Sequence, residues 1–422
     1  MPPSIFCKMQ KKITKIIAEE IKDSSGNPTI KVTVWVGTDS GSFSVPSGAS
    51  TGIHEAHVVE THKAISNVNE IIAKALIGQD VSNQKEIDQI MLELDGTLNK
   101  DNLGGNSMVG VSIACAKVAA KISGVEVYEY LRTLAEIKPS RKTPYLFMNL
   151  VEGGKHAHNG LAFQEYHVLS EAENAREAID IGVKIDNTLK EIIKESGDEV
   201  VWGDEGGFTL KTSDIKRPLE LLTKAIKKNS LEGKVKFALD VAASSFYKNG
   251  LYQVDGKNTR PNDRDHSVGR VSKEELMGIY DSLISEFNLF SIEDPFHEED
   301  FESFSELRQK NPNLLVVGDD LTVSNKTLLQ KAIDKNSINS IIIKPNQICT
   351  LSETLETMKL ARENNIELIV SHRGRETDDD FIADLAYAFG CFGLKAGAPT
   401  KPERMAKYNR LIEIENILEE EK

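Results

Sequence analysis

The second half of the chain alternates short apolar runs with stretches of helical periodicity. Each of six strand-like runs is followed by apolar residues at three- and four-residue steps, the last over about 402–418: KFALDVA, FSIEDPF, LVVGDDL, SIIIKPN, ELIVSH and FGLKAG. Two earlier runs, PYLFMNLVEGG and LAFQEYHVL, are also predicted to be strands. Strands that alternate with helices indicate parallel βα units, so eight strands in this order predict a closed β/α barrel.

Between the second and third of these strands, two helices are expected over roughly 171–196. The glycines of GDEGGF, which comes next, predict a loop.

The first 137 residues follow another pattern and are predicted to form a separate α+β domain, with the barrel over 138–422. KPSRKTP interrupts the periodicity at this boundary. The isoleucine spacing over residues 13–21 predicts a helix before the strand-like TIKVTVWV, although a β-hairpin around SSGNP fits the same residues. Further helices are expected over 56–78, 83–94 and 107–122.

Residues 47–52, SGASTG, are six small residues in a row. Such a stretch cannot anchor a core, but its backbone can approach a ligand closely, as in a mobile flap. An ordinary surface loop is the alternative.

Charged or polar residues end six of the predicted barrel strands: Asp240, Glu293, Asp319, Lys344, His372 and Lys395. Active sites of β/α barrels lie at the carboxyl ends of the strands, so this pattern predicts a site at that rim. Three carboxylates brought together repel one another and need a cation. Oxygen donors without Cys or a paired His favour Mg²⁺ over Mn²⁺ or Zn²⁺.

Lys344 stands next to these carboxylates and is a candidate base. A free lysine has a pKa of about 10.4, so a base that works near neutrality must lose about 3 units, or ~4 kcal/mol. A metal beside it acts in that direction, and a metal-bound carboxylate substrate has an acidified α-proton. The pattern therefore predicts proton abstraction next to a carboxylate.

Glu205, between the glycines of GDEGGF, is a candidate acid, with a turn or capping carboxylate as the alternative. His156 and Glu165 flank the loop between the first two barrel strands and are predicted to line the same cleft.

Composition and net charge limit the kinds of partner and the cellular compartment that are expected. A formal net charge of −14 argues against nucleic acid or an anionic membrane as the main partner. No apolar run approaches 18 residues and no secretory signal is recognised, so a cytoplasmic protein is expected. The four cysteines have no metal-binding spacing and are expected to be free and mostly buried.

Ten segments resemble the signature sequences of the enolase (phosphopyruvate hydratase) family, over about residues 13–416: SGASTGIHEA, GGKHA, FQE, GDEGGF, ALDVAAS, SIEDPF, GDDLTV, IKPNQI, SHRGRETDDDFIADL and LKAGAP…ER…AKYN. The resemblance implies an enolase-type barrel, ββαα(βα)6, capped by the N-terminal α+β domain. It also implies a hairpin at SSGNP. The implied reaction is the reversible dehydration of 2-phosphoglycerate to phosphoenolpyruvate in glycolysis.

The resemblance also implies a role for each matching residue. Asp240, Glu293 and Asp319 would hold one Mg²⁺, and Ser50 a second Mg²⁺ that is shared with the substrate. Lys344 would take the C2 proton, and Glu205, assisted by Glu165, would protonate the departing hydroxyl. The remaining implied contacts to substrate come from His156, Gln164, His372, Arg373, Gly374 and Lys395. Family members are homodimers or octamers.

The chain departs from the family pattern at several positions. Ser25 replaces an arginine, and HVVET replaces LELRD after HEA, both in segments related to the subunit interface. Gly374 replaces a serine that helps to hold the phosphate, and Arg375 replaces a glycine. Pro345 follows the lysine, and Cys349 replaces another glycine. Two alternatives therefore stand beside an enolase: a diverged lyase acting on another carboxylate, and a non-catalytic binding protein.

Overall fold

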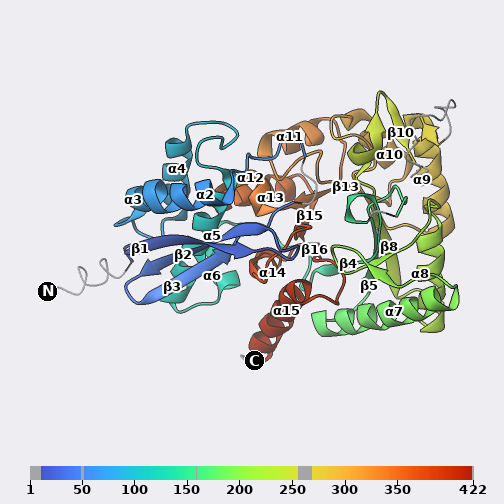
Figure 1. Ribbon diagram of the computed structural model, residues 1–422, viewed down its shortest axis with the longest axis horizontal. Coiled ribbons are helices and arrows are strands. Elements are labelled where there is room, and N and C mark those ends of the chain that lie inside the picture. Colours follow the sequence, from blue (N-terminus) through green and yellow to red (C-terminus); the bar gives the residue numbers. More distant parts are fainter. Residues whose placement is uncertain (1–10, 49–51, 158, 255–268, 421–422) are drawn as a thin grey trace.

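The computed structural model describes residues 11–48, 52–157, 159–254 and 269–420. Figure 1 shows two parts side by side, an N-terminal sheet with its helices and a larger β/α barrel. The N-terminal part contains, in chain order, β1 (Lys15–Lys22), β2 (Pro28–Val36), β3 (Asp39–Ser44), α2 (Thr61–Ser66), a π-helical segment (Asn67–Ile72), α3 (Ala73–Leu76), α4 (Gln84–Asp95), α5 (Gly105–Ser123) and α6 (Val127–Leu134).

The first strands form an antiparallel hairpin, so the helix predicted over residues 13–21 is wrong and the alternative is correct. Strand β1 pairs with β2 from Lys15↔Trp35 to Lys22↔Pro28. The carboxylate of Asp23 accepts hydrogen bonds from the backbone N–H groups of Ser25 and Asn27 and closes the turn. These cross-strand bonds, with the burial of alternate residues in β1, override the helical spacing of the isoleucines.

Helix α5 packs across this sheet and is the most deeply buried helix of the N-terminal part. The approach is close at Gly41 of β3, where an added Cβ would lie 2.3 Å from the backbone nitrogen of Val118. The helix predicted over 56–78 begins later, at Thr61. No single helix of the described residues is long and apolar enough to span a membrane; α5 and α6 pass that test only as a pair bent by 108°.

Eight strands close the barrel in the order β16-β15-β14-β13-β12-β8-β5-β4, with β16 pairing back to β4. Strand β5 runs antiparallel to both of its neighbours, and the other pairings around the barrel are parallel. The barrel strands are β4 (Tyr145–Glu152), β5 (Glu165–Ser170), β8 (Val235–Asp240), β12 (Ser291–Glu293), β13 (Leu315–Gly318), β14 (Ser340–Ile343), β15 (Glu367–Ser371) and β16 (Gly393–Lys395).

Helices follow the strands and cover the outside of the barrel (Figure 1). They are α7 (Ala175–Glu195), α8 (Arg217–Lys228), α9 (Lys273–Phe287), α10 (Phe301–Lys310), α11 (Lys326–Asp334), α12 (Pro345–Ile348), α13 (Leu351–Glu363), α14 (Phe381–Ala388) and α15 (Pro402–Glu420), with short 3₁₀ turns at Gly154–His156 and Ala243–Phe246. Side-chain caps begin several of them: Asn174 caps α7, and Ser272 caps α9 in a capping box with Glu275.

The two helices expected over 171–196 are one continuous helix, α7, and the second helix, α8, comes after GDEGGF. The segment between α7 and α8 holds two short strands, β6 (Val201–Trp202) and β7 (Phe208–Thr209), which extend the sheet beside β4, with the glycines of GDEGGF forming the turn between them. Another small sheet that was not predicted precedes α9: β9 (Tyr247–Lys248), β10 (Leu251–Gln253) and β11 (Arg270–Val271).

An apolar cluster fills the barrel interior and is separate from the main core under the helices. It consists of Tyr145, Phe147, Leu169, Ala238, Val317, Ile342 and Ile369. Gly393 is required here, because an added Cβ would lie 2.5 Å from the Phe147 ring. The barrel is therefore a packed core with no channel through this layer.

Candidate active site

The parallel pairing of the barrel strands brings the predicted strand-end residues to one rim. Glu293 and Asp240 are direct partners in the register of β12 and β8. Asp319 directly follows β13, Lys344 follows β14, and Lys395 ends β16. All five are buried at the side chain or nearly so, and four of them, with Glu293 left out, line one pocket. The predicted convergence is present in the fold.

Glu165, the first residue of strand β5, lies at the same rim as the residues that end the other strands. Because β5 is antiparallel to its neighbours, its start lies at the rim where the other strands end. Glu165 is there the register partner of Asp240 on one side and of Glu152 on the other. The reversal adds a carboxylate to the rim without an additional strand.

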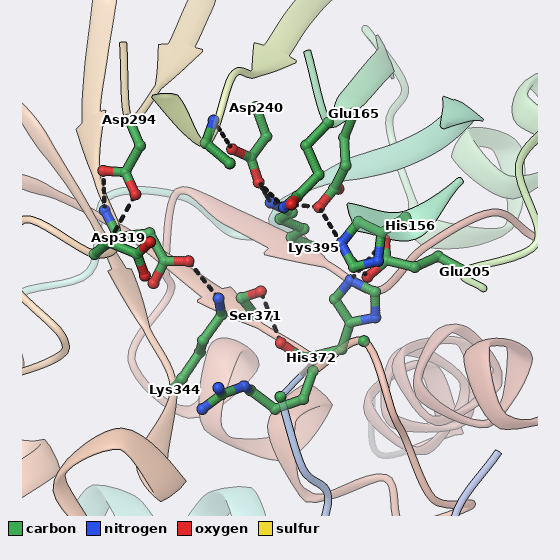
Figure 2. Close-up of a pocket in the computed structure, with 16 residues that line it drawn as sticks. His156, Glu165, Glu205, Asp240, Asp294, Asp319, Lys344, Ser371, His372 and Lys395 are labelled. Carbon is green, nitrogen blue, oxygen red and sulfur yellow. Dashed lines mark hydrogen bonds and ion pairs between the residues drawn. The ribbon is translucent and has the colours of Figure 1, made fainter. Parts of the chain in front are cut away.

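Lys395 is surrounded by carboxylates (Figure 2). Its Nζ lies 2.8 Å from Asp240 Oδ2, 2.9 Å from Glu293 Oε1 and 3.3 Å from Glu165 Oε1. Burial alone disfavours the ammonium, but these three carboxylates raise the pKa of Lys395 well above its usual range. Lys395 is therefore a fixed positive charge at the centre of the rim.

Lys344 contacts the next carboxylate, as an ion pair with Asp319 Oδ2 (Figure 2). Burial lowers the pKa of Lys344, while the charge of Asp319 raises it, and the net direction is upward. Asp319 also accepts a hydrogen bond from Gln347 at 2.9 Å. In the protein alone the candidate base is thus held as an ammonium by a single carboxylate.

The donor set at the rim fits a hard divalent cation. Burial, together with repulsion from neighbouring carboxylates, raises the pKa of Asp240 and raises that of Glu293 well above its usual range. The positive charge of Lys395 alone therefore does not offset the burial and mutual repulsion of these two carboxylates. In addition, Oε1 of the buried Gln164 lines the pocket and has no hydrogen-bond partner within the described residues.

The predicted trio is less compact than a finished metal site. In the described part of the chain, the carboxylate and imidazole groups that lie within 4.8 Å of one another are His156 with Glu165 and Glu205, and Asp294 with Asp319 and Asp320. Asp240, Glu293 and Asp319 do not form such a group among the described residues, and Lys395 Nζ contacts both Asp240 and Glu293.

Opposite Lys344, a cluster of carboxylates and imidazoles surrounds His156. His156 Nε2 lies 3.5 Å from Glu165 Oε1 and 3.7 Å from Glu205 Oε1. Burial lowers the pKa of His156, but Glu205 and Glu165 raise it to about 9. Burial raises the pKa of Glu205, and His372 and His156 bring it below its usual range. At neutral pH the proton of this cluster therefore belongs to His156.

Glu152 supports the loop that carries Glu205, and it was not predicted. Its carboxylate accepts hydrogen bonds from the backbone N–H groups of Glu205 and Gly207, at 3.1 and 2.6 Å. It is fully buried, and burial together with the charge of Glu205 raises its pKa to about 8. Glu152 ends the first predicted barrel strand, so its position at a strand end could have identified it as a rim residue.

Arg373 is paired with a residue of the N-terminal part. Its guanidinium donates to both oxygens of Glu55, at 2.9 and 3.1 Å, and to Asn346 Oδ1 at 3.1 Å. Glu55 also accepts from the backbone N–H of Gly52, at 3.1 Å. Neither Glu55 nor Asn346 was predicted, although both belong to quoted motifs, HEA and IKPNQI.

The remaining predicted residues are placed as follows. Gly374 lines the pocket, and its carbonyl accepts a hydrogen bond from Arg404. Arg375 forms a backbone bridge with Ser47, and its side chain is exposed. Ser50 lies outside the described residues, as does Cys7. Cys115, Cys349 and Cys391 are free and buried, as expected.

The closed barrel, with buried carboxylates, lysines and imidazoles gathered at the carboxyl ends of its strands, defines the class of the chain as a β/α-barrel enzyme. The family model "Enolase, C-terminal TIM barrel domain" matches residues 140–422, and "Enolase, N-terminal domain" matches residues 13–131. A protein named Enolase from Methanocaldococcus jannaschii is 44% identical, covering 96% of this chain and 95% of that protein.

Two further relatives give the same result. Enolase B from Dictyostelium discoideum is 42% identical, and Enolase from Corynebacterium kroppenstedtii is 39% identical, each with 96% of this chain and 95% of the relative covered. The chain belongs to the enolase family, whose members are carbon–oxygen lyases. Membership implies a small-molecule substrate and the use of a divalent metal.

Proposed function

We propose that this chain catalyses the reversible dehydration of 2-phospho-D-glycerate to phosphoenolpyruvate. The observation that carries the proposal is the placement of Lys344 on one side of the pocket and of the Glu205 cluster on the other, with the carboxylate rim between them. An elimination of this kind needs a base at C2 and an acid at the C3 hydroxyl, on separate elements.

Lys344 is proposed as the base. In its neutral form Nζ takes the C2 proton of the substrate, and the ion pair with Asp319 keeps Nζ at the rim beforehand. Asp240, Glu293 and Asp319 would hold Mg²⁺, which when bound would supply positive charge to stabilise the negative charge that develops on the substrate carboxylate as C2 loses its proton. Lys395, fixed among these carboxylates, would bind the substrate carboxylate from the other side.

Glu205 is proposed to deliver a proton to the departing hydroxyl, with Glu165 and His156 beside it. His156 is the group in this cluster that holds a proton at neutral pH, and it lies within 4 Å of both carboxylates. A proton passed from His156 through Glu205 would leave with the hydroxyl as water.

Arg373 and Gly374 are proposed to bind the phosphate. Arg373 would then exchange Glu55 for the phosphate, since both are anions that accept from the same guanidinium edge. Ser50 is proposed to bind a second Mg²⁺ together with the substrate, and Gln164 and His372 to line the closed site.

The wider setting is also a proposal: a glycolytic and gluconeogenic enzyme of the cytoplasm, with the domain boundary between residues 137 and 138. Its proposed assembly is a homodimer, or an octamer built from such dimers. Size-exclusion chromatography with light scattering tests the assembly, and a monomer at micromolar concentration would contradict it.

The activity is tested by following the ultraviolet absorbance of phosphoenolpyruvate while Mg²⁺ is added to the purified chain with 2-phosphoglycerate. Mg²⁺-dependent turnover is expected. Metal binding without turnover would instead favour another carboxylate substrate, and no metal binding would favour a non-catalytic role.

A further inference from the structure

Arg404 is a fully buried arginine in the first turn of α15, behind the pocket. Its guanidinium reaches two segments that carry site residues. Nη1 donates to the carbonyl of Arg373 at 2.8 Å, and Nη2 donates to the carbonyls of Gly374 at 2.7 Å and Asp204 at 3.3 Å. One side chain therefore connects the segment after β15 to the loop that carries Glu205.

The fourth contact of Arg404 is with a ring nitrogen. Nη1 of Arg404 lies 2.5 Å from Nδ1 of His372. A guanidinium has five N–H donors and no acceptor, and it stays protonated in proteins. Nδ1 of His372 must therefore accept this hydrogen bond and carry no proton. In a neutral imidazole the proton then lies on Nε2.

The other edge of the ring faces the acid cluster. Nε2 of His372 lies 3.4 Å from Oε2 of Glu205, and both side chains are about 2% exposed. A protonated Nε2 directs an N–H at this carboxylate and into the pocket that His372 lines (Figure 2).

We propose that Arg404 is a positioning residue that fixes the tautomer of His372, so that His372 presents a neutral ring with an Nε2–H donor to Glu205 and to the substrate. The part that concerns the substrate rests on the proposed function; the tautomer itself does not.

The charges around His372 agree with a neutral ring. Glu205 and Glu165 face it from the barrel side and favour the charged form, as does Glu376 from the segment after β15. Burial and the positive charge of Arg404 oppose them, and the pKa of His372 is lowered from its usual value. The pKa of His156, which contacts the same carboxylates, is raised instead, and its Nδ1 has no hydrogen-bond partner among the described residues.

The two imidazoles therefore have different roles. His156 holds the cationic proton of the cluster, while His372 is confined to donating a hydrogen bond. If both rings could become cationic, either one could pass a proton to Glu205. With His372 held neutral, the proton that reaches Glu205 comes from His156.

The tautomer can be measured directly by ¹⁵N–¹H correlation through two bonds in histidine-labelled protein, without substrate. The His372 signals are assigned by their absence in His372→Gln. The expected result is a neutral ring with the proton on Nε2 from pH 6 to pH 8. A ring protonated on Nδ1, or a cationic ring in this range, would overturn the proposal.

Variants then test the role of the arginine. Arg404→Met should allow Nδ1 to take a proton, with mixed tautomers and a pKa of His372 that moves up, whereas Arg404→Lys should keep part of the preference. Arg410→Met is the matched control, because Arg410 is buried on the same helix but pairs with Asp384 and Glu126. It should lower thermal stability and leave the His372 signals unchanged.

Kinetics separate positioning from a general loss of structure. In Arg404→Lys, kcat should fall by roughly 10- to 100-fold with little change in KM, and the pH profile of kcat should shift. A His372 spectrum that is unchanged in both Arg404 variants would contradict the proposal. If the tautomer is as expected but 2-phosphoglycerate is not turned over, the proposed function fails and the tautomer assignment stands.

Discussion

At the scale of single residues, the site is governed by how a few protons are distributed among buried groups. Two lysines and one histidine hold positive charge, at Lys344, Lys395 and His156, where carboxylates outweigh the effect of burial. Glu205 and Glu165 are correspondingly held as carboxylates. Each of these states depends on up to three neighbours within 4 Å, so a single substitution can shift it.

Lys344→Ala should reduce kcat by at least ~10²–10⁴-fold, the range for a lost general base. KM for 2-phosphoglycerate should change less, because other groups are proposed to bind the phosphate and the carboxylate. Lys335→Ala is the control, since Lys335 is an exposed lysine paired with Glu302. Near-normal turnover in Lys344→Ala would sink the assignment of the base.

His156 should make the free energy of unfolding depend on pH. Its pKa is raised from 6.5 to about 9 in the folded chain, so its stabilising contribution is full below pH 6.5 and is lost as the pH rises through about 9. The contribution is on the order of 3 kcal/mol at most. Denaturant unfolding without metal at pH 6.5 and 9.5 should show a smaller difference in His156→Gln than in the parent chain.

His62→Gln, a change of an exposed histidine on α2, is the control for that measurement. An equal loss of stability in His156→Gln and in the parent chain between the two pH values would show that His156 holds no additional proton.

Much of the site could be predicted from residue types at strand ends, because a parallel barrel places such ends together. Asp240, Glu293 and Lys344 were found in this way. Glu55 could not be, because its contact with Arg373 joins positions 318 residues apart. Arg404 was missed for a different reason. A buried arginine behind a site has no local sequence signature, and Arg404 stood out only as part of the ER in one of the segments that resemble the family.

At the scale of elements, the barrel pattern was readable and the exceptions were local. The runs of β-branched and apolar residues in β13, β14 and β15 form strands that are buried apart from the first residue of β13 and of β15, and they have no competing helical period. In β1 the isoleucine spacing fits a helix, but pairing with β2 makes the segment a strand. GDEGGF was expected as a loop, but its short flanking strands were too brief to be seen in a pattern.

The contact between α5 and the residue after α12 offers an element-scale test. Cys349 has φ of 85°, a conformation that favours glycine, and an added Cβ at Gly105 would lie 2.1 Å from its Sγ. Gly105→Ala should therefore destabilise the chain by about 1–3 kcal/mol through overpacking. In a Cys349→Gly background the same change should cost less, since the clashing sulfur is gone.

A double-mutant cycle by thermal unfolding measures this coupling. The control is Gly278→Ala, inside α9 with open space around it, which reports the effect of alanine at a helical glycine without a clash. Additive effects of the two substitutions would show that the Sγ contact does not limit how closely the two parts pack.

At the scale of the whole molecule, binding of a divalent ion should stabilise the fold. Mg²⁺ at about a hundred times its Kd should raise the free energy of unfolding by about 2.7 kcal/mol, because the ion binds only the folded rim. The increase in Tm should be lost in Asp319→Asn and kept in Asp281→Asn, an exposed aspartate on α9. An equal increase in both variants would remove Asp319 from the proposed metal ligands.

The two parts of the chain meet at the segment after β15. Ser24 donates its backbone N–H to Glu376 at 2.7 Å, and Ser47 exchanges two backbone hydrogen bonds with Arg375, at 2.9 and 3.0 Å. The Glu55 pair with Arg373 lies in the same region. The N-terminal part is therefore fastened next to the proposed phosphate site and does not merely cover the barrel.

The reversed direction of β5 constrains how this barrel can tolerate insertions and deletions. In the other barrel strands, added residues ahead of the strand enter the rim remote from the site. Ahead of β5 they would enter the active rim, between Glu152 and Glu165, which are partners across the β4–β5 pair. Length changes in this connection would therefore displace two buried carboxylates at once, whereas changes in the connection from β5 to α7, at the opposite rim, would leave both in register.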